Sequence, residues 1–247
     1  MRVFILDSSF CGEEIYQLRK REKQYLLKVL RLQEGEVFTA QDKAGNYYKA
    51  TIVDEETLSI EPTDKPEDTL LDGFSAFKGT MIPITVYQCI CKGKKNEQIL
   101  RMLTEAGIEE FFLVSSDFTQ EKTLSKHDAE RLETIAKEAM QQSGSRTKIK
   151  EYNLQPLKEA LKTNDKPLIF LHQSLRGNTL MLKDTLEKID SSNGIALLIG
   201  SEGGFSDEEC AYLEEKGAFC TLLPTNILRA ETAGIFAVGA IETILNT

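Results

Sequence analysis

Two short apolar runs in the second half of the chain constrain its fold more than any other feature. LIFL at 168–171 and IALLI at 195–199 contain no charged residue, and each is too short to be a buried helix. Runs of this length that are apolar at every position are typical of central strands in a parallel sheet, which is covered on both faces. Parallel neighbours need helical crossovers, so we expect an α/β domain.

The segments around these runs supply the other elements of such a domain. The residue patterns predict strands at 84–90, 111–114 and 219–223, and amphipathic helices at 96–106, 125–144, 207–216 and 231–245. Ser206-x-x-Glu209 is a capping box at the start of the third helix. Because ligands of open parallel sheets bind at the carboxyl ends of the strands, we expect the functional site in the loops that follow them.

The first part of the chain has a different pattern. Three strand-like runs, VFTA, YYKATIV and TLSIEP, lie between residues 37 and 62, and the turn signal DKAGN between the first two predicts a hairpin. EPTDKPED at 61–68 combines two prolines with acidic residues and has no apolar periodicity, so it reads as a linker. We therefore expect two domains, at residues 1–70 and 71–247.

Composition excludes several classes of protein. With 41% hydrophobic and 28% charged residues the chain is an ordinary globular protein, and no apolar run reaches the roughly 18 residues of a membrane helix. The five cysteines are an odd number with no zinc-like spacing, and two histidines leave little material for a multi-histidine site. We expect a cytoplasmic protein with no membrane segment and no metal.

The charge distribution keeps RNA binding open. The net charge of −9 argues against a generic nucleic-acid binder, because it repels phosphate at long range. Basic residues nevertheless cluster at 19–31, 92–101 and 146–150. One such cluster alone is best explained as a solvated face; three in one chain strengthen the case for RNA contacts without settling it.

Three loops after predicted strands carry the candidate ligand site. They are His172-Gln173-Ser174, the glycine-rich loop 200–204, and the segment 224–229 that leads into the last helix. The glycines allow close backbone approach, but their spacing fits neither a dinucleotide fingerprint nor a phosphate loop. Glu202 suits a cationic ligand better than a phosphate. Taken alone, each loop could also be a plain strand-to-helix turn.

The motifs LIGSEGGFS at 198–206 and NILRAETA at 226–233 together resemble the RsmE family of bacterial 16S rRNA (uracil-N3) methyltransferases, which belongs to the SPOUT class of enzymes. VLRL at 29–32 and TEAGI at 104–108 agree with this family, so the resemblance spans nearly the whole chain. It implies a small N-terminal PUA-like β-barrel, followed by a SPOUT α/β domain with a deep trefoil knot. It also implies a homodimer.

The resemblance further implies S-adenosylmethionine as cofactor and assigns roles to individual residues. The expected cofactor-binding residues are Leu171, His172, Gly200, Ser201, Glu202, Gly203, Leu223, Pro224, Ile227 and Leu228. We expect Arg229 to stabilise negative charge on the uracil oxygens, and Glu231 to act as base or orienting acceptor. Glu202 could instead hold its loop by accepting backbone N–H groups. The alternative for Arg229 and Glu231 is an ion pair at the start of a helix.

The expected substrate is small-subunit ribosomal RNA, free or in the assembled particle. Basic residues of the three clusters would bind it, namely Arg19, Arg21, Lys23, Lys28, Arg31, Lys92 and Arg146. The chain departs from the family pattern at Phe118, Ser201, Pro224 and Asn226. Two other functions therefore stay open: another SPOUT reaction such as ribose 2′-O-methylation, and an rRNA-binding assembly factor without turnover.

Overall fold

The computed structural model describes residues 3–7, 9–64, 81–145, 147–149, 154–173 and 176–246. The chain separates into two compact units, one formed by Met1–Lys78 with Met140–Gly144 and the other by Gly79–Ala139 with Ser145–Thr247. The boundary that we predicted at residue 70 lies outside the described residues.

The first unit is built on a five-stranded mixed sheet in the order β1-β3-β4-β5-β2. The predicted hairpin is confirmed, because β3 and β4 pair antiparallel around the turn at 42–46. Alternate residues of these strands enter one hydrophobic core, as the two-residue period of a half-buried strand requires. The strands are β1 (Phe4–Ile5), β2 (Ile15–Gln17), β3 (Val37–Gln41), β4 (Tyr47–Ile52) and β5 (Thr57–Thr63).

A helical segment between β2 and β3 carries the first basic cluster. It consists of α1 (Lys20–Lys23) and a π-helical turn (Gln24–Val29). Glu22 is buried and accepts hydrogen bonds from the Tyr16 hydroxyl at 2.9 Å and from the Arg19 N–H at 3.0 Å. This carboxylate therefore fixes the start of the segment, and with it the backbone that presents the cluster.

The second unit is the predicted α/β domain. Its eight strands follow the order β11-β13-β10-β12-β6-β7-β8, with β9 beside β7, and the pairings between these strands are all parallel. The two apolar runs form the central strands β10 and β12, as predicted. The strands are β6 (Ile84–Cys89), β7 (Glu110–Ser115), β8 (Lys148–Ile149), β9 (Gln155–Pro156), β10 (Leu168–Leu171), β11 (Leu180–Met181), β12 (Ile195–Ile199) and β13 (Phe219–Leu222).

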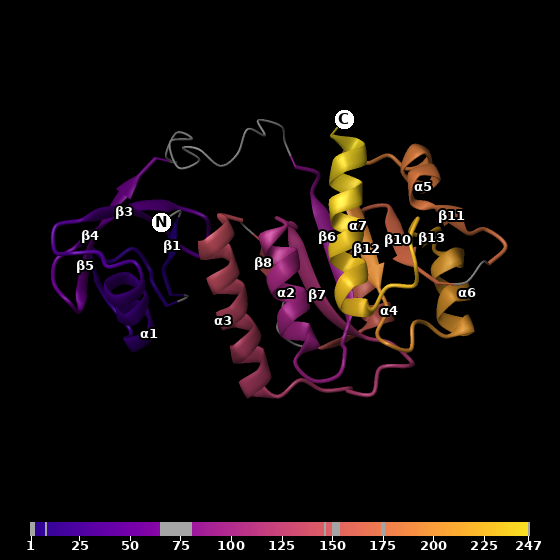
Figure 1. The fold of residues 1–247 in the computed structure, drawn as a ribbon, viewed down its shortest axis with the longest axis horizontal. Coiled ribbons are helices and arrows are strands. Elements are labelled where there is room, and N and C mark those ends of the chain that lie inside the picture. Colours follow the sequence, from indigo (N-terminus) through magenta and orange to yellow (C-terminus); the bar gives the residue numbers. More distant parts are fainter. Residues whose placement is uncertain are drawn as a thin grey trace. The chain divides into compact units, whose positions relative to one another are not determined.

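Helices cover both faces of this sheet. In β12, Ala196 and Leu198 point into a core that includes apolar residues of α4 and α6. Ile199 points the other way, toward α7, where a Cβ on Gly234 would lie 2.8 Å from Ile199 Cδ1. Figure 1 shows α2 and α7 together on this side of the sheet. The helices are α2 (Lys95–Glu105), α3 (Lys126–Ser143), α4 (Leu157–Ala160), α5 (Leu182–Lys188), α6 (Asp207–Glu215) and α7 (Ala230–Leu245).

The four helices that the sequence predicts correspond to α2, α3, α6 and α7, within two residues at each end. The capping box is confirmed, because Ser206 Oγ accepts the Glu209 N–H at 3.1 Å and Glu209 accepts the Ser206 N–H at 3.0 Å. The trefoil knot stays a prediction from the resemblance. Among the described residues, no helix is both long enough and apolar enough to cross a membrane.

Candidate functional site

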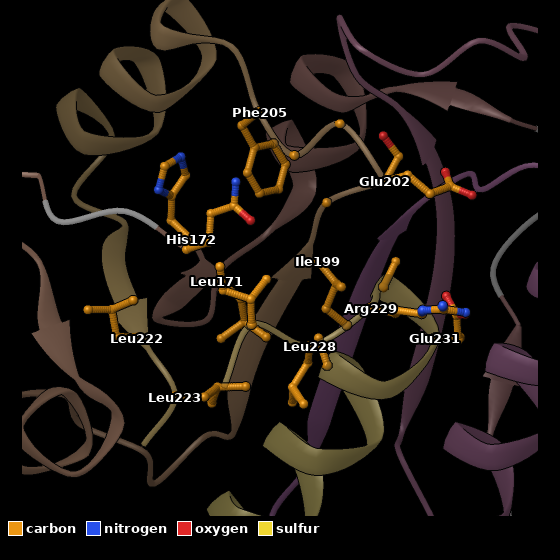
Figure 2. Close-up of a pocket in the computed structure, with 18 of the residues that line it drawn as sticks. Leu171, His172, Ile199, Glu202, Phe205, Leu222, Leu223, Leu228, Arg229 and Glu231 are labelled. Carbon is orange, nitrogen blue, oxygen red and sulfur yellow. The ribbon is translucent and has the colours of Figure 1, made fainter. Parts of the chain in front are cut away.

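A cleft of about 510 Å³ lies at the carboxyl ends of β10, β12 and β13. The three loops that follow these strands line it, together with the start of α7. Figure 2 shows the side chains gathered around it, with leucines on one side and Glu202, Arg229 and Glu231 on the other. The cleft therefore lies where we expected a ligand site in a parallel sheet.

The glycine-rich loop after β12 turns sharply on itself. Ser201 and Gly204 form a β-bridge, and a Cβ on Gly200 would lie 3.0 Å from Gly204 Cα. Gly204 has φ +70°, a conformation that other residues adopt at a cost. A side chain at position 200 would thus push the two arms of the loop apart, and this is the physical reason for glycine there.

Packing and a helix cap fix the end of the glycine-rich loop. Phe205 is buried and meets the Phe170 ring edge-to-face, with 6.1 Å between the ring centroids. The next residue, Ser206, is the N-cap of α6. The glycine loop is therefore held between a central strand and a capped helix, so the part of the cleft that it lines has a fixed shape.

One side of the cleft is apolar. Leu171 is the last residue of β10, and Leu223 and Leu228 lie in the loop between β13 and α7, so two segments distant in sequence meet here (Figure 2). Ile227 stands at the same site with 77% of its surface exposed. Apolar surfaces of this kind suit an aromatic ring system.

The opposite side is a network of charges. Lys95 Nζ lies 2.7 Å from Glu202 Oε1 and 3.9 Å from Glu231 Oε2. Glu202 also accepts the Lys92 N–H at 3.3 Å. Arg229 Nη1 lies 3.9 Å from Glu231 Oε1. Two carboxylates and two cations from three segments therefore meet at one end of the cleft.

The contact between Lys95 and Glu202 favours the ionised form of both side chains. Burial raises the pKa of Glu202, but hydrogen bonds from Lys95 and from backbone N–H groups outweigh it, so the pKa lies below its ordinary value. The hydrogen bond to Glu202 raises the pKa of Lys95. Burial raises the pKa of the neighbouring Cys91 thiol to about 12, so this thiol is neutral.

Two buried oxygen atoms of the cleft have no hydrogen-bond partner, Ser201 Oγ and Glu231 Oε2. Buried polar atoms in folded proteins are almost always hydrogen-bonded, and leaving one unpaired costs about 1–3 kcal/mol. A polar ligand that reaches these two atoms would remove that cost.

Nine of the ten residues predicted to bind cofactor line the cleft, and Pro224 is not among the lining residues. Arg229 and Glu231 also line it, although their 3.9 Å separation leaves the helix-start ion pair a weak one. Lys95 was not predicted for this site. The sequence placed it only in a basic cluster, and its contacts with Glu202 and Glu231 come from residues more than a hundred positions away.

Some of the predicted RNA-binding residues form ion pairs with carboxylates, and others are exposed. Arg19 pairs with Asp7 at 2.6 Å and Lys23 with Glu56 at 2.7 Å. Arg21, Lys28, Arg31 and Lys92 are exposed. Arg146 lies outside the described residues. No group of three or more metal-ligating side chains occurs in the part of the chain that the structure describes.

Comparisons with known proteins place the chain in a family. The model of a family described as RNA methyltransferase domain matches residues 78–242. Ribosomal RNA small subunit methyltransferase E of Synechocystis sp. is 28% identical over 242 residues, covering 95% of this chain and 75% of that protein. The enzyme of the same name from Bacillus subtilis is 26% identical and covers 95% of this chain and 89% of its own.

The fold is also shared with solved structures. A ribosomal RNA small subunit methyltransferase E from Neisseria gonorrhoeae, bound to S-adenosyl methionine, superposes with a TM-score of 0.76. The two chains are 24% identical, and the match covers 99% of this chain and 98% of the other. Both units of the present chain therefore have counterparts in that structure.

Proposed function

The chain belongs to the RNA methyltransferase family, and from this premise we propose that it transfers a methyl group from S-adenosylmethionine to N3 of a uridine in small-subunit ribosomal RNA. The observation that carries the proposal is the cleft at the carboxyl ends of β10, β12 and β13, which combines a leucine wall with a charged end. The curated relatives named for small-subunit ribosomal RNA support the substrate.

The residues of the cleft fit this cofactor. The Ser201 Oγ without a hydrogen bond fits a polar group of the cofactor, and the leucine side chains suit an adenine ring. Leu171, Leu223 and Leu228 would hold the base, while the backbone of the glycine loop would hold the polar part. When bound, S-adenosylmethionine supplies a methyl group on a positively charged sulfur.

The chain itself has to position the uracil and manage one proton. N3 lies on the Watson–Crick edge, so the target base must be unpaired or turned out of its stack. Arg229 is exposed at the mouth of the cleft and can donate to a uracil oxygen. Glu231 is the acceptor for the N3 proton. Orientation and charge stabilisation then provide most of the acceleration.

The first basic cluster provides an RNA-binding surface in this proposal. Arg21, Lys28 and Arg31 lie on one short helical segment and its end, and they are exposed. Their charges can neutralise phosphates on either side of the target, so affinity should fall steeply with salt. Arg19 and Lys23 contribute less, since both are already paired with carboxylates.

We also propose that the protein acts as a homodimer in the cytoplasm, where its ribosomal substrate is made. Apolar side chains that a monomer would leave in water support the dimer: Ile227 at the cleft is 77% exposed, and Phe236 on α7 is 39% exposed. Sedimentation of the purified chain at micromolar concentration tests this, and a monomer would contradict it.

Mapping of modified nucleosides tests the reaction. Small-subunit rRNA from cells that lack the gene should miss one N3-methyluridine, which returns with the intact gene. Restored ribose methylation would instead show a different reaction, and no change would favour an assembly factor without turnover. Arg229→Ala should bind cofactor normally but turn over at least tenfold more slowly. Near-normal turnover would remove the role of Arg229.

A charge-reversal pair tests the RNA-binding surface. Arg21→Glu with Lys28→Glu should weaken rRNA binding strongly and leave cofactor affinity unchanged. Lys43→Glu with Lys49→Glu is the matched control, because it changes the net charge of the same unit by the same amount elsewhere. Equal losses in both pairs would contradict a specific surface at α1.

A further inference from the structure

Lys95 reaches into the cleft from an element that does not otherwise line it. It is the first residue of α2, and its side chain is 35% exposed. An ammonium group has three N–H donors, and the 2.7 Å contact with Glu202 uses one of them. Lys95 can therefore donate to a ligand while Glu202 holds it in place.

Glu231 presents an acceptor beside this donor. Its side chain is 14% exposed, and Oε2 has no hydrogen bond. At 3.9 Å, Lys95 Nζ is too far away to satisfy it, and Arg229 Nη1 is equally far from the other oxygen. Lys95 and Arg229 therefore flank Glu231, one beside each carboxylate oxygen, and both distances are longer than a direct hydrogen bond.

Two donors on either side of an acceptor match the hydrogen-bonding groups of one particular base. The imide of uracil presents an acceptor, a donor and an acceptor in O4, N3–H and O2. We propose that Lys95, Glu231 and Arg229 together recognise this imide edge, and that Lys95 is a further catalytic residue that donates to one of its carbonyl oxygens. The inference rests on the proposed function and adds the group that selects the base.

The same contacts account for the proton. The N3–H bond breaks, the proton passes to Glu231 Oε2, and the electron pair stays on the imide, where it spreads over N3 and both carbonyl oxygens. Lys95 and Arg229 donate to the two oxygens that gain this charge. N3 then uses an electron pair to bond the methyl carbon while the C–S bond of the cofactor breaks, which leaves S-adenosylhomocysteine, and Glu231 returns its proton to solvent. Donors aimed at developing charge each contribute about 10²–10³ in rate in other enzymes.

The same three side chains explain why the site would select uracil over cytosine or a ribose hydroxyl. Cytosine places an amino donor where uracil has O4, so one cation would face a donor, and its N3 carries no proton for Glu231. A ribose hydroxyl offers a single donor and has no use for two flanking cations. A site that hydrogen-bonds one substrate edge rejects analogues lacking it, because its own polar groups stay unpaired.

A purely structural role for Lys95 would require only its contact with Glu202. The Lys95–Glu202 contact alone joins α2 to the glycine loop. It leaves Glu231 Oε2 without a hydrogen bond inside the cleft, and a ligand with an N–H or O–H group would supply one. The charged or titratable groups that face Lys95 are Glu202, Glu231 and Cys91, and Arg229 faces Glu231.

The test compares Lys95→Met with Lys94→Met on small-subunit rRNA transcripts made with uridine or with 5-fluorouridine. Lys94 is the adjacent exposed lysine at the N-cap of the same helix, so it controls for lost charge. We expect Lys95→Met to turn over about 100-fold more slowly on the uridine transcript, with cofactor affinity not reduced. Lys94→Met should behave as wild type, and Lys95→Arg should recover at least part of the loss.

Fluorine makes the imide more acidic, so the anion needs less help. The deficit of Lys95→Met relative to wild type should therefore be at least tenfold smaller on the fluorinated transcript than on the uridine transcript. An equal deficit on both transcripts would show a structural role and overturn the inference. If wild type forms N3-methyluridine and Lys95→Met is as fast, the inference fails while the proposed function stands. If wild type methylates no uracil, the proposed function itself fails.

A binding measurement gives a readout without turnover. The full chain, labelled with ¹³C at lysine Cε, is titrated with uridine 5′-monophosphate and with cytidine 5′-monophosphate and followed by NMR. The Lys95 signal should shift with the uridine nucleotide at concentrations at least tenfold lower than with the cytidine nucleotide. Equal responses to both nucleotides would overturn the assignment of Lys95 to the imide edge.

Discussion

Gly194 precedes β12, the strand that carries the glycine loop, and its replacement by alanine should destabilise the second unit. Its φ is +95°, and a Cβ there would lie 2.2 Å from the carbonyl oxygen of Pro83. That oxygen also accepts the Ile195 N–H at 3.0 Å, which joins the start of β12 to the segment before β6. Alanine cannot be accommodated without moving this backbone.

Two costs add in this variant. A left-handed conformation costs an L-residue about 1–2 kcal/mol. Forcing extra volume into a packed site costs about 1–3 kcal/mol more. We therefore expect Gly194→Ala to lower the free energy of unfolding of the second unit by about 2–5 kcal/mol, a large share of the 5–15 kcal/mol typical of a domain.

Gly217→Ala is the matched control. Gly217 follows α6 with φ +79°, and a Cβ there would meet no atom within 4 Å. It therefore carries only the conformational cost of about 1–2 kcal/mol. Hydrogen exchange of peptides from β6 and β12, with urea unfolding of the full chain, measures both variants. Equal destabilisation would refute the conclusion that the Pro83 contact makes Gly194 obligatory.

Two further perturbations follow from the charged groups. Glu202→Gln should lower the pKa of Lys95, because the hydrogen bond to Glu202 is the largest cause of its elevation, and ¹³C NMR of lysine Cε would contradict this by showing no decrease. With the Glu202 pKa lowered and the Lys95 pKa raised, the wild-type pair should be lost only as pH falls below about 4.5 or rises above about 10.5. Glu22→Gln should destabilise the first unit by about 2–4 kcal/mol, since the buried carboxylate accepts from Tyr16 and Arg19. In a protein that already carries Tyr16→Phe, Glu22→Gln should lower the free energy of unfolding by at least 1 kcal/mol less. Equal losses with and without Tyr16→Phe would show that the two side chains do not interact.

The sequence predicted the parts of the fold that depend on local patterns. β10 and β12 were found because central strands are apolar on both faces, and α6 was found because its capping box is local. The two-residue strands β8, β9 and β11 were not predicted, because pairs so short exist only through their neighbours. The order of the strands in the sheet is likewise not encoded in any local period.

The candidate site divides in the same way. Most of the expected cofactor residues line the cleft, because the loops after parallel strands must meet at one edge of the sheet. Lys95 was overlooked as a site residue, since its spacing in sequence fits an exposed basic cluster. Its contacts with Glu202 and Glu231 depend on how α2, the glycine loop and α7 come together in space.

Calorimetric titration of the full chain with S-adenosylmethionine tests the central claim most directly. Ala233→Leu places a larger side chain in the cleft, while Ala211→Leu makes the same change at an exposed position of α6 that does not line it. Wild type and Ala211→Leu should bind one molecule per chain with equal affinity, and Ala233→Leu should bind at least tenfold more weakly. No binding by wild type, or unchanged binding by Ala233→Leu, would contradict a cofactor site in this cleft.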